Sequence, residues 1–154
     1  MHIVLVEPEI PPNTGNVARL CAATKSVLHL VGPLGFKLDN AQLRRAGMDY
    51  WQHLDWHRWP AWTAFQNSLR PGARLWFIES NGPRLYSEVQ YSDADYLVFG
   101  RETAGLPKKL LEENRDNWLR IPMFNPNARS LNLSNCVGLV LFEALRQKGF
   151  PGGT

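Results

Sequence analysis

Short, almost wholly apolar segments separated by helix-like stretches constrain the fold of this chain more than any other feature. Four of them have the length and the β-branched or aromatic content of strands: His2–Val6, Val27–Val31, Leu75–Ile78 and Tyr96–Phe99. A strand that is apolar on both faces is typical of a parallel sheet covered by helices on both sides. The sequence therefore predicts an α/β fold, with a mainly parallel sheet flanked by helices.

The stretches between these strands have the spacing and the start signals of helices. Asn13 and Thr14 are expected to cap a helix that runs to about Thr24. Three more helices and one more strand are expected, the helices over 40–46, 61–69 and 136–146 and the strand over 118–121. No linker, internal repeat or low-complexity segment divides the pattern, so we expect a single domain over residues 1–154.

The composition limits the cellular setting and the class of partner. The chain has no apolar run near the ~20 residues that span a bilayer, and its first residues lack the pattern of a signal peptide. Cys21 and Cys136 are the only cysteines, which predicts free thiols in a cytoplasmic protein rather than a disulfide framework. A formal net charge of +3 is compatible with an anionic partner such as nucleic acid, without requiring one.

The first loop of chemical interest follows the first predicted strand. Asn16 and Arg19 are one helical turn apart, so they share a face near the amino terminus of the predicted helix. Arg19 at that place can hold an anion or stabilise developing negative charge. Asn13 in the same loop has two open interpretations, a simple helix cap or a member of a site.

The second loop follows the strand that ends at Phe99. Gly100 and Gly105 bracket Glu102 there, and glycine allows positive φ and close approach of a ligand to the backbone. A plain strand-to-helix turn explains Gly105 and Pro107 but leaves the carboxylate unexplained. The spacing is neither that of the dinucleotide-binding fingerprint nor that of a P-loop.

The third loop combines small polar side chains with leucines before a continuous apolar run. Ser and Asn alternate with Leu from Ser130 to Asn135, and the apolar segment 136–142 follows directly. Such a segment can start a buried helix and present uncharged donors and acceptors to a ligand. Because ligands bind at the carboxyl ends of parallel strands, we expect the three loops to lie together.

Taken together, the three loops resemble the SPOUT superfamily of RNA methyltransferases over essentially the whole chain. The matching motifs are Asn13-x-Gly15-Asn16-x-x-Arg19, Phe99-Gly100-x-Glu102-x-x-Gly105-Leu106, Ile121-Pro122-Met123 and Arg129-Ser130-Leu131-Asn132-Leu133-Ser134-Asn135. The opening segment resembles the small subfamily that methylates the wobble-nucleotide ribose of certain tRNAs, and it reads Glu7-Pro8-Glu9-Ile10-Pro11-Pro12-Asn13-Thr14-Gly15-Asn16.

That resemblance implies an enzyme, its cofactor and its assembly. The enzyme would use S-adenosylmethionine to methylate the ribose 2′-hydroxyl of the wobble nucleotide, a cytidine or modified uridine, in the anticodon region of tRNA. It would be a homodimer, with a trefoil knot in the carboxyl-terminal part of each chain. No metal is implied.

The resemblance also implies roles for individual residues. The cofactor pocket would be lined by Ile78, Gly100, Gly105, Ile121, Ser130 and Leu131. The positions used for catalysis or for organising the site would be Asn13, Arg19, Glu102, Ser130 and Asn132. Nothing is carried over to residues 124–128, which match no fixed motif of the family.

The chemistry of this reaction constrains the role of Arg19. The ribose hydroxyl would displace a methyl group from a sulfonium, so positioning and handling of the hydroxyl proton are the main tasks. The three loops contain no histidine. A guanidinium with a pKa above about 12 is a poor base, so we interpret Arg19 as a ligand of the nucleotide phosphate that also stabilises the developing alkoxide. Glu102 is expected to orient Arg19 or the hydroxyl.

Two other classes of function stay open at this stage. A non-catalytic RNA-binding module of the same fold would not need Arg19, Glu102 and Asn132 together. A nucleotide-binding oxidoreductase would be expected to carry the glycine fingerprint that this chain lacks.

The remaining conspicuous residues have simpler interpretations. The aromatic cluster is expected to serve the core or a subunit interface, although it could stack on bases, and it comprises Tyr50, Trp51, Trp56, Trp59 and Trp62. His53 and His57 flank Asp55, but no further ligand stands at metal-binding spacing, so a metal site is disfavoured.

Overall fold

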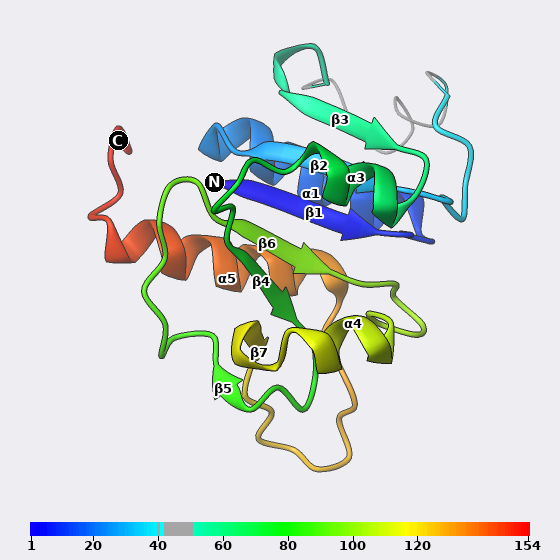
Figure 1. Ribbon diagram of the computed structural model, residues 1–154. Coiled ribbons are helices and arrows are strands. Elements are labelled where there is room, and N and C mark those ends of the chain that lie inside the picture. Colours follow the sequence, from blue (N-terminus) through cyan, green and yellow to red (C-terminus); the bar gives the residue numbers. More distant parts are fainter. Residues whose placement is uncertain (40, 42–50) are drawn as a thin grey trace.

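A computed structural model describes residues 1–39, 41 and 51–154 of the protein and contains a seven-stranded sheet (Figure 1). Its strands are β1 (His2–Val6), β2 (Val27–Val31), β3 (Trp56–Trp59), β4 (Leu75–Ile78), β5 (Arg84–Leu85), β6 (Tyr96–Phe99) and β7 (Trp118–Arg120). They lie in the order β3-β2-β1-β6-β4-β7-β5, and every pair is parallel. The predicted α/β fold with a parallel sheet is confirmed. The trefoil knot stays a prediction.

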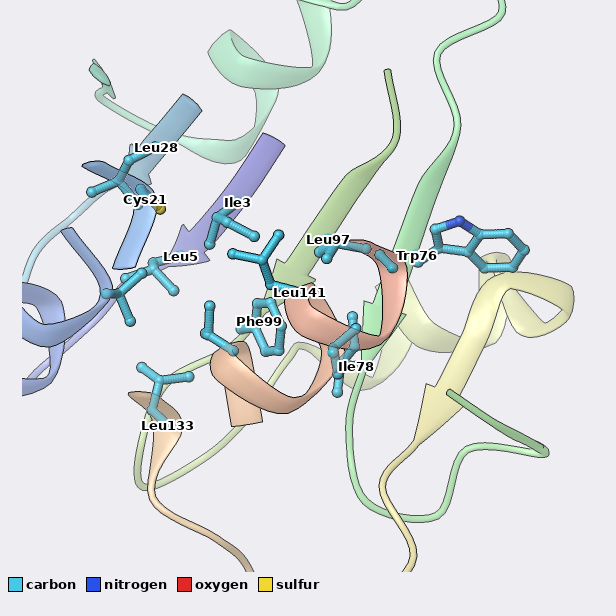
Figure 2. Packing of buried hydrophobic residues seen from close by; sticks show 14 of the residues in the cluster. Ile3, Leu5, Cys21, Leu28, Trp76, Ile78, Leu97, Phe99, Leu133 and Leu141 are labelled. Atoms are coloured by element: carbon cyan, nitrogen blue, oxygen red, sulfur yellow. The ribbon is translucent and has the colours of Figure 1, made fainter. Parts of the chain in front are cut away.

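Helices cover both faces of this sheet (Figure 1). The described helices are α1 (Pro11–Thr24), α3 (Trp62–Ser68), α4 (Lys108–Glu113) and α5 (Leu133–Gln147), with short 3-10 turns η1 (Trp51–His53) and η2 (Arg115–Asn117). Helices α1 and α5 pack on one face, where Figure 2 shows Leu141 of α5 meeting Ile3 and Phe99 of the sheet. Helices α3 and α4 cover the other face through Phe65 and Leu111.

Two helices begin at other residues than the sequence predicts. Helix α1 begins at Pro11, whose fixed φ suits a first helical position, and Ile10 is its N-cap, without a side-chain cap bond. Asn13 is buried in the first turn, so its prediction as the cap was wrong. Helix α5 begins at Leu133 rather than 136, because the Asn132 side chain caps it by accepting from the Ser134 N–H at 2.9 Å. The predicted helix over 40–46 falls, except for residue 41, outside the described residues.

The sequence also missed both edge strands. Strand β3 is partly exposed along its length, and β5 has only two residues. Edge strands are short and face solvent on one side, so they lack the continuous apolar pattern by which the inner strands were found.

The aromatic cluster divides between the two cores, as the core interpretation predicted. Trp51 and Trp56 stand 4.5 Å apart, ring centre to ring centre, and pack against the α1/α5 side. Trp59 and Trp62 pack against the other core. Tyr50 lies outside the described residues.

The helices of the described segments include none with the length and apolar character needed to cross a membrane. Within the same segments, no group of three or more His, Cys, Asp or Glu side chains is arranged to hold a metal ion.

Candidate active site

A pocket of about 540 Å³ opens where β4, β6 and β7 end and where α1 and α5 begin. Of the residues that the sequence singles out, those that line it are Asn13, Ile78, Gly100, Glu102, Gly105, Ile121, Ser130, Leu131 and Asn132. Segments far apart in the chain thus meet at the carboxyl edge of the sheet, where ligands of parallel sheets bind. Arg19 is exposed on α1 and is not part of this lining as the described residues form it.

The loop after β6 folds back on itself at the floor of the pocket. Arg101 and Gly105 form an isolated bridge, in which each backbone N–H donates to the other residue's carbonyl, at 3.2 and 2.9 Å. Gly105 has φ +65°, and a Cβ on Gly100 would lie 2.2 Å from the Gly105 carbonyl carbon. Both glycines are therefore required by the turn itself.

Glu102 projects from this loop onto the start of α1. Its carboxylate accepts from the backbone N–H of Glu9 at 2.8 Å, the N–H of Ile10 at 3.1 Å and the Asn13 side-chain amide at 3.3 Å. A carboxylate is favoured there because a helix amino terminus has unpaired N–H donors and a positive dipole end. Glu102 thus holds the β1–α1 segment.

Asn13 extends this contact to the third loop. Its Oδ1 accepts from the Asn132 amide Nδ2 at 2.9 Å, and the Asn132 Oδ1 accepts from the Ser134 hydroxyl at 2.6 Å. Hydrogen bonds thus run without a break from Glu102 through Asn13 and Asn132 to Ser134, and they fix the orientation of both side-chain amides. We call this series the hydrogen-bonded chain. It joins all three loops and fixes the polar wall of the pocket.

Two further contacts tie the loop after β6 to the segment after β1. The Arg101 guanidinium donates to the Glu7 carboxylate at 2.6 Å, and the Thr103 hydroxyl donates to the Glu9 carboxylate at 2.8 Å. Both pairs are largely exposed, so their energetic contribution is small. They set the position of the pocket rim.

Glu79 is a pocket residue that sequence reasoning missed. It follows β4 directly, and its carboxylate accepts from the Leu106 N–H at 2.9 Å and from the Ser80 N–H and hydroxyl, both at 2.9 Å. A signal was present in the sequence, since an acidic residue after an apolar strand is the pattern that singled out Glu102.

The pocket wall also contains the thiol of Cys136. Burial, with the Glu79 charge adding to it, raises the pKa of Cys136 to about 11. That thiol therefore stays neutral at physiological pH.

The lining suits a ligand with both apolar and polar parts. Apolar walls come from Ile78, Phe99, Ile121 and Leu131, and polar groups from the hydrogen-bonded chain, Glu79 and Ser130. The volume lies within the roughly 300–1,000 Å³ typical of pockets for such ligands. Histidine is absent from the lining among the described residues, so the site is arranged for binding and orientation rather than around an imidazole base.

Comparisons with known proteins agree with this arrangement. The model of the SpoU rRNA Methylase family matches residues 1–142. A tRNA (cytidine(34)-2′-O)-methyltransferase of Saccharophagus degradans is 53% identical over 154 residues, covering 98% of this chain and 97% of that protein.

Solved structures of RNA methyltransferases are also similar to this chain. One described as "Structural insights into the 2-OH methylation of C/U34 on tRNA" superposes with a TM-score of 0.90 at 45% identity, over 96% of this chain and 95% of that one. An AdoMet-bound rRNA methyltransferase from Sinorhizobium meliloti gives a TM-score of 0.81 at 28% identity, over 94% of this chain and 55% of the other.

Proposed function

Because the chain belongs to the SpoU rRNA methylase family, we propose that it methylates the ribose 2′-hydroxyl of the wobble nucleotide, a cytidine or modified uridine, in tRNA. The main support for this proposal is that the three loops singled out in the sequence all line one pocket. The methyl donor is S-adenosylmethionine. The enzyme works in the cytoplasm as a single domain.

The residues present fit the donor. Adenosine needs a flat apolar slot, which Ile78, Ile121 and Leu131 supply, and the turn at Gly100 and Gly105 brings backbone groups to the pocket surface. Ser130 adds a hydroxyl to the lining. S-adenosylmethionine, when bound, supplies an activated methyl group that an oxygen nucleophile can displace.

The hydrogen-bonded chain gives the site its orientation. Glu102 fixes Asn13, and Asn13 fixes the Asn132 amide. An amide has two N–H donors, and Asn132 gives one of them to Asn13, so we assign the other to the ribose. Holding the reacting groups in one geometry is the main contribution that these residues make to the rate.

Arg19 acts from outside the pocket lining. We assign it to the phosphate of the target nucleotide and to stabilisation of the developing alkoxide, because a guanidinium is a strong anion ligand and a poor base. Its exposed position on α1 suits a group that meets RNA rather than the methyl donor.

The enzyme acts as a homodimer. Helix α5 buries one face against the sheet, whereas Leu139 and Phe142 on it are 44% and 48% exposed. Phe150 packs beside Phe142 and is also exposed, so the three form an apolar patch that a second copy would cover.

Mass spectrometry of tRNA incubated with the protein and S-adenosylmethionine tests the function directly. We expect one ribose methyl group at the wobble nucleotide.

Arg19→Ala tests the role of this residue. The variant should bind S-adenosylmethionine with nearly the wild-type affinity in calorimetry and yet lose methylation. Full turnover by this variant would refute the role of Arg19, and binding of tRNA without any methyl transfer by the wild type would favour the non-catalytic RNA-binding module instead.

A further inference from the structure

Phe124 is the most exposed large apolar side chain among the described residues. It is 94% exposed, about twice the value of Phe142 at 48%. Burial is what makes a phenylalanine stabilise a fold, so a ring left in water contributes almost nothing to the stability of this chain. Neither the proposed reaction nor the hydrogen-bonded chain of the pocket uses it.

The place of Phe124 in the fold connects it with the pocket mouth. It lies in the segment between β7 and α5, which Figure 1 shows as a projecting loop. Its neighbour Met123 lines the pocket, and the loop returns to the lining at Arg129. Phe124 is therefore next in the chain to a lining residue, close to where we expect the nucleotides adjoining a bound ribose to lie.

The loop presents this ring from an ordered turn. The Asn125 side-chain oxygen accepts from the Asn127 N–H at 2.9 Å, and the Asn125 carbonyl accepts from the Ala128 N–H at 3.0 Å. These bonds fix the backbone that directly follows Phe124, so less backbone entropy is lost when a partner binds the ring.

The chemistry around the ring matches RNA. Between residues 121 and 136 the only charged side chain is Arg129, a cation that suits a phosphate, and Asn125 and Asn127 add uncharged donors and acceptors. Bases of single-stranded RNA are recognised by stacking on aromatic rings beside such groups.

We propose that Phe124 stacks on a nucleobase next to the reacting ribose and thereby helps to hold the anticodon loop of the tRNA. This inference rests on the proposed function, because it takes tRNA as the substrate. A second copy of the chain is the other occupant to consider, but the apolar patch of Leu139, Phe142 and Phe150 already offers a surface for it. Phe124 lies on the loop between β7 and α5, whereas that patch is formed by α5 and the residues that follow it.

Variants of Phe124 test the proposal through tRNA binding. Removing one base-stacking ring typically weakens binding by about 5- to 150-fold. We expect Phe124→Ala to raise the Kd for tRNA and the KM for tRNA within this range. Its affinity for S-adenosylmethionine and its melting temperature should stay at the wild-type values. Phe124→Trp should retain binding, whereas Phe124→Leu, which keeps apolar bulk without a ring, should lose most of it.

An abasic series identifies the stacked base. The base of the target nucleotide and that of each neighbour would be removed in turn from an anticodon stem-loop. At one position, removal should cost the wild-type protein as much as Phe124→Ala does, with little further loss when both changes are combined. Equal tRNA binding by Phe124→Ala and the wild type would overturn the proposal, as would a smaller sedimentation coefficient for the variant, which would place the ring in a subunit contact. Wild-type protein that neither binds nor methylates tRNA would instead refute the proposed function.

Discussion

At the scale of single residues, we propose that Glu102 is a positioning group rather than a group that meets the substrate. Its carboxylate is committed to three donors from the segment that starts α1, one of them the Asn13 amide. The sequence indicated that Glu102 matters but predicted that it orients Arg19 or the hydroxyl. The partner was not predictable, because Glu9 and Glu102 are 93 positions apart and meet only in the folded sheet.

Glu102→Gln tests the positioning role. The amide keeps the size of the side chain but loses its charge and turns one acceptor into a donor, which then faces backbone N–H groups. Hydrogen bonds to charged groups contribute about 1.5–3 kcal/mol, so we expect kcat to fall by about 10- to 100-fold. The KM and Kd for S-adenosylmethionine should change little. Single-turnover kinetics and calorimetry measure the two quantities separately.

Glu88 offers a matched control for this variant. Its carboxylate also accepts from a backbone N–H, that of Leu85 at 2.9 Å, but it does not line the pocket as the described residues form it. Glu88→Gln should leave kcat unchanged. Equal losses in the two variants would mean that Glu102 acts only through general stability.

At the scale of elements, four neighbouring strands align a row of rings across one face of the sheet. Tyr96 of β6, His2 of β1, His29 of β2 and His57 of β3 stack at centre-to-centre distances of 4.2, 5.2 and 5.3 Å. The indole Nε1 of Trp59 donates to His29 Nδ1 at 3.2 Å, and His29 Nε2 faces His2 Nδ1 at 3.0 Å. An indole N–H only donates, so His29 Nδ1 is unprotonated.

This row of rings predicts a loss of stability in acid. Burial, with the neighbouring His2 and His57 adding to it, lowers the pKa of His29 to about 3. The unfolded chain, with a histidine pKa of about 6.5, therefore takes up a proton at a higher pH than the folded chain does. The free energy of unfolding should fall by about 2 kcal/mol between pH 7 and pH 5 from this group. Urea unfolding at the two pH values measures it.

Histidine variants separate this effect from other titrations. His29→Gln should show a smaller drop between pH 7 and pH 5, whereas His53→Gln, at an exposed position, should keep the wild-type drop. An unchanged drop in His29→Gln would show that other groups cause the acid sensitivity.

The sequence predicted the bounds of the strands well where burial on both faces of the sheet determines them. The bounds of β1, β2, β4 and β6 match the apolar segments, because inner strands are covered on both faces. The starts of α1 and α5 were missed, since they depend on Pro11 and on a cap from Asn132, a residue that also has a role in the site.

At the scale of the whole molecule, the proposed homodimer makes a prediction about α5. Phe142→Glu would place a charge in the apolar patch and should weaken self-association by at least about 10-fold, because an unpaired buried charge is costly. Sedimentation velocity over a concentration series measures the change. Gln66→Glu, on the exposed side of α3, adds the same charge elsewhere and should leave the dimer intact. Equal self-association of Phe142→Glu and the wild type would place the interface on another surface.

Much of the architecture followed from one rule, that loops at the carboxyl ends of parallel strands share a ligand site. The family resemblance, rather than this rule, supplied the individual site residues; nine of the ten line one pocket and Arg19 does not, and their roles stay predictions. The order of the strands was not predictable, because it depends on which crossovers pass over which face of the sheet. Glu79 was overlooked although it follows the same rule.

The hydrogen bond between Asn13 and Asn132 joins positions that are 119 residues apart. A chain emerging from the ribosome therefore has no site until nearly all of it has been made and α5 has docked. Because a ligand stabilises only the state that binds it, S-adenosylmethionine should favour finished molecules over partly folded ones. Copies that end before α5 lack the Asn132 side of the pocket, so we expect them to leave S-adenosylmethionine to the intact enzyme.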